Sequence, residues 1–322
     1  MNVLVKGAGV AGLATALELQ RRGAQVTVFD PQKRVGGSAS WYAGGMLAPW
    51  CEGECADKRV TELGIAATGW WNNVLPGHVE CNGTLVVAPA RDHAELNRFA
   101  SRTTGFRAVD AKEIGALEPA LSDRFRRGLF FENEAHLEPR LAMQALQVCL
   151  ARTGCSFRLG RTVADQTGFD AVVDCTGIAS PVAGLRGVRG EMLLLRIADL
   201  PLKRPVRLLH PRIPVYVVPR GENLFMIGAT MIESADHGGA TVRSVLELLN
   251  AAYALHPAFA DAEIVEIGAG IRPAFSDNLP RVSRHRGTIS LNGLYRHGFL
   301  LAPVLAARAA AMALETRDAA NG

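Results

Sequence analysis

The stretch Val3-Leu-Val-Lys-Gly-Ala-Gly-Val-Ala-Gly12 decides how this chain folds. An apolar strand runs into a Gly7-x-Gly9-x-x-Gly12 turn, and the residues after the turn have the apolar spacing of a helix. A second apolar strand, Val26–Phe29, then ends in Asp30. Such a βαβ unit with an acidic end binds dinucleotides, with the pyrophosphate at the helix N-terminus and the ribose at the carboxylate.

A second glycine-containing segment, Gly293-Leu-Tyr-Arg-His-Gly-Phe-Leu-Leu-Ala-Pro303, precedes the last predicted helix. We expect that helix to begin near Pro303, where backbone N–H groups and the positive end of the helix dipole could hold developing negative charge. One such helix start suits a pyrophosphate, and the other suits a reduced isoalloxazine ring. The two segments together indicate a flavin enzyme rather than a nicotinamide enzyme.

The composition is that of an ordinary soluble protein, with 48% hydrophobic and 20% charged residues among 322. The net charge of +4 comes without blocks of like charge, which argues against nucleic acid as a partner and is compatible with an anionic substrate. No apolar run approaches the roughly 20 residues that span a bilayer. Six scattered cysteines predict free thiols and no metal site. We expect a cytoplasmic protein.

The remaining segments predict two lobes whose sequences interleave. A helix from about Thr241 to Ala254 is capped by Thr241, with Val242, Val245, Leu246 and Leu249 on its buried face. We expect an α/β, Rossmann-like lobe of residues 1–75, 136–186 and 266–322, and an α+β lobe of residues 76–135 and 187–265 that binds substrate. Six β-rich runs predict an antiparallel sheet in the second lobe: Gly83–Ala88, Gly128–Glu132, Gly190–Ile197, Arg207–Leu209, Val215–Pro219 and Leu224–Ala229.

Five further motifs stand between the two glycine segments: Ala43-Gly-Gly-Met-Leu-Ala-Pro49, His136-Leu-Glu-Pro-Arg140, Tyr216-Val-Val-Pro-Arg220, Ile227-Gly-Ala-Thr-Met231 and Gly270-Ile-Arg-Pro273. In this order, the set resembles the FAD-dependent amine oxidases of the D-amino acid oxidase and sarcosine oxidase type, most closely the glycine oxidases of thiamine biosynthesis. The resemblance covers nearly the whole chain and implies an FAD-binding lobe of the glutathione-reductase type. Related sarcosine oxidases attach their flavin through a late cysteine. No cysteine follows Cys175 here, so the resemblance implies noncovalent FAD.

The resemblance also implies which residues contact FAD. The first βαβ unit would bind the ADP half, the glycine-dense loop near residue 44 would lie along the flavin, and the segment after Gly293 would line its pyrimidine end. A strand ending in Thr176-Gly177 would close against the cofactor. The expected contacts are Gly7, Gly9, Val10, Ala11, Gly12, Asp30, Ala39, Ser40, Gly44, Gly45, Met46, Val163, Thr176, Gly177, Leu294, Tyr295, Arg296, His297, Gly298, Phe299 and Leu300.

Arg272 is the main candidate for binding a substrate carboxylate, because its planar guanidinium donates two parallel N–H bonds. From the residues alone, an ion pair between Arg272 and Asp277 is an equally good interpretation. We expect Tyr216 to donate to the same carboxylate and Arg296 to add a second contact, so these three are the predicted catalytic residues. Met46 and Cys51 complete the predicted substrate pocket, although core packing explains Met46 equally well.

The implied reaction is hydride removal from the Cα of glycine or another small amino acid to flavin N5, with oxygen as the electron acceptor. It would yield an imine, or glyoxylate and ammonia, and hydrogen peroxide, and would supply thiazole assembly. A D-amino acid or sarcosine oxidase or dehydrogenase, and a tRNA aminomethyl-uridine-modifying module, are the alternatives within the fold. A scaffold with structural FAD and a nicotinamide dehydrogenase are further alternatives. Whether the protein forms a homo-oligomer is left open by the sequence.

Overall fold

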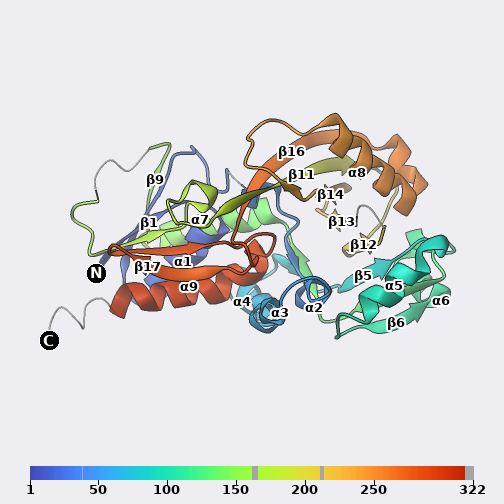
Figure 1. Ribbon diagram of the computed structural model, residues 1–322, viewed down its shortest axis with the longest axis horizontal. Helices are drawn as coiled ribbons and strands as arrows, with labels where there is room; N and C mark the ends of the chain where they lie inside the picture. The colour runs from blue at the N-terminus through green and yellow to red at the C-terminus, as the bar shows by residue number, and fades with distance from the viewer. Residues whose placement is uncertain (38, 162–165, 211–213, 316–322) are drawn as a thin grey trace.

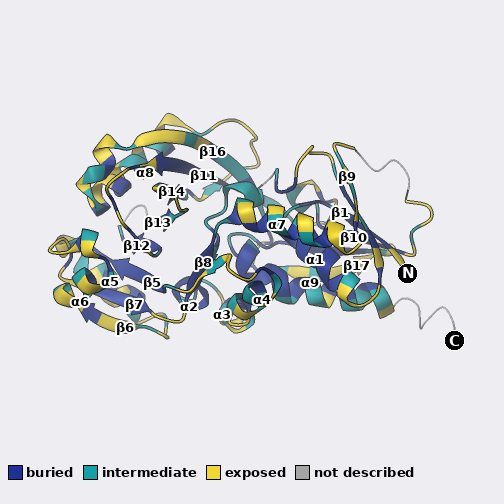
Figure 2. Cartoon of the chain, turned by 180° about the vertical axis from the view of Figure 1, so that it is seen from behind, coloured by how far each residue is buried: buried dark blue, intermediate teal, exposed yellow. Residues whose placement is uncertain are grey.

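The computed structural model describes residues 1–37, 39–161, 166–210 and 214–315. Two large sheets lie side by side along the long axis of the molecule, and the N-terminus lies at the end formed by the first sheet (Figure 1). Helices cover the first sheet, and Figure 2 shows that its central strands and the inner faces of these helices are buried. The mixed α/β and antiparallel architecture predicted from the sequence is confirmed.

The first sheet has six strands in the order β17-β18-β10-β1-β2-β9. All neighbours are parallel except β17 and β18. The apolar β1 is central and buried, as expected for a parallel strand covered on both faces. Helix α1 (Val10–Arg21) contacts both α7 (Pro139–Arg152) and α9 (Gly298–Leu314). The strands are β1 (Asn2–Lys6), β2 (Gln25–Asp30), β9 (Ser156–Leu159), β10 (Ala171–Asp174), β17 (Arg281–His285) and β18 (Thr288–Asn292).

The second sheet has nine strands. Eight follow the order β15-β11-β14-β13-β12-β5-β7-β6, and the ninth, β16, pairs with β11 on the edge opposite β14. It is antiparallel except between β12 and β5, and each of the six β-rich runs predicted from the sequence contributes a strand. The strands are β5 (Thr84–Val87), β6 (Arg107–Asp110), β7 (Arg127–Phe131), β11 (Arg186–Arg196), β12 (Val206–Leu208), β13 (Val215–Pro219), β14 (Leu224–Gly228), β15 (Ile232–Glu233) and β16 (Glu263–Ala274).

The remaining elements pack beside α9, connect the two sheets or cover the second. Helix α8 (Val242–Leu255) packs on the second sheet, and a small third sheet has the order β3-β8-β4. The short elements are β3 (Met46–Leu47), β4 (Val79–Glu80), β8 (Ala135–Leu137), α2 (Pro49–Glu52), α3 (Lys58–Gly64), α4 (Ala67–Val74), α5 (His93–Ala100) and α6 (Ala111–Leu117).

Helix α8 begins as predicted, and its buried face is as predicted in part. The Thr241 side chain accepts a hydrogen bond from the Ser244 N–H, as an N-cap should. Val245 and Leu249 pack against the core of the second sheet, as predicted. Val242 and Leu246, however, are exposed, while Leu248 and Leu255 are buried. The prediction was wrong for Val242 and Leu246 because several apolar residues compete in this helix, and the position of the sheet decides which stripe is covered.

The predicted division into two lobes stays a prediction, although the sheets group the segments in a similar way. Strands from residues 2–30, 156–174 and 281–292 form the first sheet. Strand β16 remains paired with β11 as far as Ala274, beyond the boundary expected at residue 266. This strand therefore carries Arg272 on the second sheet while reaching the first.

The last helix begins earlier than predicted. Helix α9 starts at Gly298, and Pro303 lies inside it. Proline has no N–H to donate to the carbonyl four residues earlier, which here belongs to Phe299. The indole N–H of Trp71 donates to that carbonyl instead, at 2.9 Å. The prediction of a helix start near Pro303 was therefore wrong because a distant side chain compensates for the missing backbone bond.

Candidate active site

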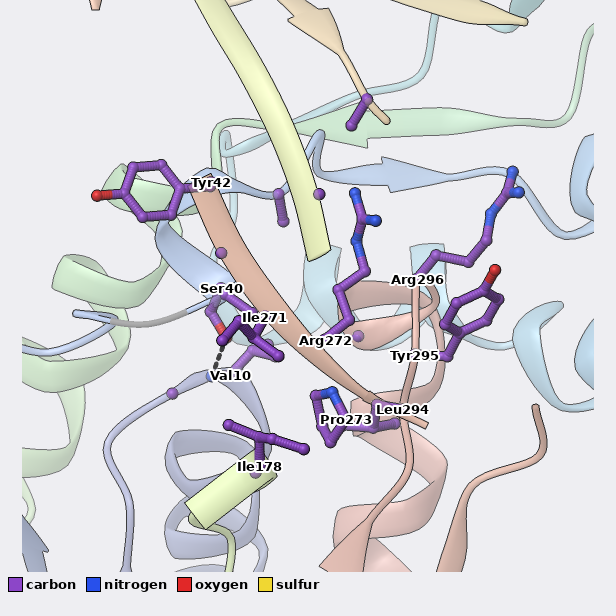
Figure 3. Close-up of a pocket in the computed structure, with 18 of the residues that line it drawn as sticks. Val10, Ser40, Tyr42, Ile178, Ile271, Arg272, Pro273, Leu294, Tyr295 and Arg296 are labelled. Atoms are coloured by element: carbon purple, nitrogen blue, oxygen red, sulfur yellow. Dashed lines mark hydrogen bonds between the residues drawn. The ribbon is translucent and has the colours of Figure 1, made fainter. Parts of the chain in front are cut away.

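A cavity of about 570 Å³ runs from the β1–α1 turn to the inner face of the second sheet. Figure 3 shows its lining, with Val10 and Ser40 at one end and Arg272 and Arg296 extending in the same direction at the other. Most residues predicted to contact the cofactor or the substrate line this cavity. Two that do not are Gly12 and Cys51, and Val163 lies outside the described residues.

The glycine turn leaves no room for side chains where a dinucleotide is expected. Gly7 has a φ of 99°, and a Cβ there would lie 2.5 Å from the carbonyl oxygen of Cys175. A Cβ on Gly12 would lie 1.9 Å from the Gly7 carbonyl oxygen, so Gly12 permits close packing of the helix on its turn. Gly9 caps α1 without a side-chain hydrogen bond of its own, and the Val10 N–H donates to Ser40 Oγ at 3.2 Å. The N-terminus of α1 faces the cavity, and the positive end of its dipole is suited to an anionic group.

Asp30 lines the cavity at the end of β2, as the sequence predicts. One carboxylate oxygen accepts the Ala8 N–H at 2.6 Å, and the other accepts the Gln32 N–H at 2.8 Å. Asp30 therefore fixes the glycine turn and the loop after its own strand. Each carboxylate oxygen retains a lone pair for a ribose hydroxyl.

The turn that precedes α9 brings the second glycine segment to the cavity, which Leu294 to Leu300 line. The Tyr295 N–H donates to the Pro273 carbonyl at 2.9 Å, so this turn is attached to the end of β16. Nδ1 of His297 is buried without a hydrogen-bond partner among the described residues. An unsatisfied buried polar atom beside the cavity fits a site that a polar cofactor completes.

Arg272 reaches the cavity from β16 and is partly buried. Its Nη1 donates to the Thr230 carbonyl at 3.0 Å, and it pairs with no carboxylate among the described residues. Asp277, the alternative partner considered from the sequence, pairs with Arg281 instead, at 3.0 Å. Burial, followed by the charge of Arg296, lowers the pKa of the Arg272 guanidinium to about 10. A partly buried cation that has no carboxylate partner in the described residues fits a site for a substrate carboxylate.

Gly190 makes room for the Arg272 guanidinium. The two residues lie on neighbouring strands, β11 and β16, and a Cβ on Gly190 would lie 2.1 Å from Nη2 of Arg272. Any side chain at residue 190 would therefore displace the guanidinium from the cavity.

Glu52 lies at the centre of a charged network that the sequence did not reveal. Its carboxylate accepts from Tyr216 Oη at 2.9 Å, pairs with Arg296 Nε at 2.9 Å and contacts His297 Nε2 at 3.0 Å. Burial opposes ionisation, but the Arg296 charge and the His297 hydrogen bond outweigh it and hold the pKa of Glu52 well below its usual value. Glu52 is therefore ionised and neutralises one of the two arginines beside the substrate position.

Tyr216 and Arg296 reach the cavity as predicted, but both have internal partners. The Tyr216 hydroxyl donates to Glu52, and Nη2 of Arg296 donates to the Tyr216 oxygen at 3.0 Å. Although burial opposes its charge, Glu52 holds the pKa of Arg296 well above its usual value. Among the described residues, Arg272 is therefore the arginine at this end of the cavity that pairs with no carboxylate.

Cys51 does not line the cavity as expected. It is fully buried among apolar residues, and its N–H donates to Glu134 at 2.7 Å. Burial raises the pKa of the Cys51 thiol, so the thiol stays protonated. Helix α2 directs Cys51 into the core and the next residue, Glu52, into the cavity. Met46 does line the cavity and also packs on a buried cluster, so its role in a substrate pocket stays a prediction.

The fold and this cavity define the class of protein: a dinucleotide-dependent oxidoreductase with a charged substrate pocket. A family model described as FAD dependent oxidoreductase, DAO, matches residues 2–312. The chain therefore belongs to this family and is an FAD-dependent oxidoreductase. The sequence-based prediction of a flavin enzyme is confirmed.

Similar proteins narrow the comparison further. The chain is 55% identical to a Rhizobium etli protein named "Putative thiamine biosynthesis oxidoreductase ThiO", over 96% of this chain and 95% of that protein. It is 27% identical to a glycine oxidase of Pseudomonas putida, over 94% and 91% of the two chains. The glycine oxidase structure from Geobacillus kaustophilus shares the fold with a TM-score of 0.80 and 23% identity, over 98% and 94% of the two chains.

Neither a membrane span nor a metal site is found in the part of the chain that the structure describes. None of its helices is long and apolar enough to cross a bilayer. The same residues contain no cluster of three or more histidine, cysteine or acidic side chains that could hold a metal ion.

Proposed function

We propose that this enzyme oxidises glycine, or a similarly small amino acid, to an imine that hydrolyses. The balanced reaction converts glycine, oxygen and water to glyoxylate, ammonia and hydrogen peroxide. The observation that carries the proposal is Arg272, a partly buried guanidinium that faces the cavity without a carboxylate partner among the described residues. The names of the similar proteins support glycine as substrate and thiamine biosynthesis as the process served. We place this activity in the cytoplasm.

In this proposal, Arg272 binds the substrate carboxylate through two parallel charge-assisted hydrogen bonds. Holding the carboxylate fixes the Cα, and such orientation can supply a large part of a rate enhancement. Bound FAD supplies the acceptor for the hydride that leaves Cα. The residues with cofactor roles are those of the glycine turn, the loop from Ala39 to Met46, and the turn before α9, all of which line the cavity.

Glu52 and its partners complete the proposed pocket. Because Arg296 is neutralised by Glu52, the pocket attracts one carboxylate at Arg272 without a second strong anion site. Tyr216 and Met231 line the same end of the cavity. These side chains favour a substrate with a small substituent on Cα.

The proposal predicts the pH dependence of the reaction. No carboxylate or histidine is assigned as a base, so the substrate must bind as its free amine. We expect kcat/KM for glycine, measured by peroxide release, to rise with pH until the amine of free glycine is deprotonated. Glyoxylate and peroxide should appear in equal amounts at every pH. A flat pH profile, or peroxide without glyoxylate, would contradict the proposal.

A further inference from the structure

The proline-arginine ends of two motifs, Glu138-Pro-Arg140 and Pro219-Arg220, do not line the cavity. Glu138-Pro-Arg140 begins α7, and Arg220 follows β13, and none of these side chains reaches the cavity. They meet instead behind the loop from Ala39 to Met46, whose other side lines the cavity.

Arg220 joins the second sheet to both this loop and α7. Its guanidinium forms an ion pair with Glu138, the N-cap residue of α7. Nη2 also donates to the carbonyl oxygen of Ala43 at 2.5 Å. The Arg220 side chain is only 3% exposed, so water does not screen these contacts. A buried, charge-assisted contact of this kind fixes the position of its acceptor.

Arg140 makes the reciprocal connection from α7 to the second sheet. Its Nη1 and Nη2 form a two-pronged ion pair with Glu266 of β16, at 2.8 and 2.9 Å. Its Nε donates to the Trp41 carbonyl at 3.1 Å, and its guanidinium lies 4.6 Å from the centre of the Trp41 ring. A cation in the first turn of a helix is opposed by the helix dipole, so α7 alone does not favour arginine here.

The loop is therefore held at two carbonyls by two arginines from opposite sides. Between Trp41 and Ala43, the Tyr42 ring packs where β16 has glycines: a Cβ on Gly268 would lie 2.4 Å from that ring. Tyr42 also lines the cavity.

We propose that Arg140 and Arg220 are positioning residues for FAD, which clamp residues 41–43 in the conformation that accepts the flavin. Each arginine pairs with a carboxylate on the opposite side of the interface between α7 and the second sheet, so the clamp also ties the two sheets together around the cofactor. Preorganising this loop lowers the entropy that FAD binding must otherwise remove. The inference depends on FAD binding and not on the identity of the substrate.

The test is the affinity of apoprotein for FAD, measured by quenching of flavin fluorescence, together with the melting temperature of the apoprotein. Arg220→Met should raise the Kd for FAD about tenfold or more. Arg220→Lys, which keeps a charge beside Glu138, should recover part of the affinity. Arg140→Met, at a side chain that is 17% exposed, should act in the same direction and serves if Arg220→Met does not fold.

Arg204→Met is the matched control. Arg204 is also mostly buried and pairs with Glu118 at 2.8 Å while donating to the carbonyls of Asn82 and Leu117, but it does not line or support the cavity. We expect this variant to lower the melting temperature of the apoprotein and to leave the Kd for FAD unchanged. An unchanged Kd in Arg220→Met and Arg140→Met, or an equal rise in Arg204→Met, would overturn the proposal.

Discussion

Replacing Arg272 by methionine is expected to lower kcat/KM for glycine about a thousandfold, because two charge-assisted hydrogen bonds of about 1.5–3 kcal/mol each are lost. Arg272→Lys should raise the apparent KM about tenfold, since an ammonium keeps the charge but not the planar pair of donors. The measurement is steady-state peroxide release over a range of glycine concentrations, with FAD content checked from the visible flavin band.

Two further variants make this result specific. Gly190→Ala leaves Arg272 in place in the sequence but puts a methyl group where its guanidinium lies, so it should also raise KM. Arg281→Met removes an exposed arginine that pairs with Asp277, and it should leave KM unchanged. If Arg272→Lys had the same KM for glycine as the natural protein, Arg272 would not be a substrate-binding residue.

Glu52→Gln is expected to destabilise the protein by about 3 kcal/mol at neutral pH, because it leaves the buried Arg296 without its counter-ion. The pH dependence of this destabilisation follows from the lowered pKa of Glu52. The Glu52 carboxylate stabilises the folded protein fully at pH values above its unfolded-state pKa of 4.5. This stabilisation is lost as the pH falls through the lower pKa that Glu52 has in the folded protein. The stability difference between the natural protein and Glu52→Gln should therefore narrow as the pH is lowered below 4.5.

Glu263→Gln is a suitable control for this effect. Glu263 pairs with Arg196 at 2.7 Å, but both side chains are about half exposed, so the loss of this pair should cost about 1 kcal/mol or less. Denaturant unfolding of both variants at several pH values provides the comparison. A Glu52→Gln protein as stable as Glu263→Gln at neutral pH would show that the central ion pair contributes little.

The cofactor half of the molecule could be predicted because its signals are local. The glycine turn, the apolar strands and Asp30 lie within thirty residues, and each has a conformation or contact that its residue type requires. Six of the nine strands of the second sheet were predicted for the same reason. Arg272 was predicted as a substrate-binding residue because a specific motif surrounds it. In the structure, its alternative partner, Asp277, pairs with Arg281 instead.

What the sequence missed depends on contacts between distant segments. Glu52 meets Arg296 across 244 positions, and nothing near Glu52 distinguishes it from a surface carboxylate. The orientation of α2 turns Cys51 into the core and Glu52 into the cavity, and a four-residue helix has no periodicity to show this. The start of α9 was misplaced because Trp71, 228 positions away, replaces the bond that Pro303 cannot make.

The most direct test of the central claim is an anaerobic titration of the purified, FAD-containing protein with glycine, followed by admission of air. The account predicts that glycine bleaches the visible flavin band, and that air restores the band with release of hydrogen peroxide. Bleaching that persists in air would indicate a dehydrogenase. A flavin band that glycine leaves unchanged would contradict glycine as substrate and direct the same titration to sarcosine and D-amino acids.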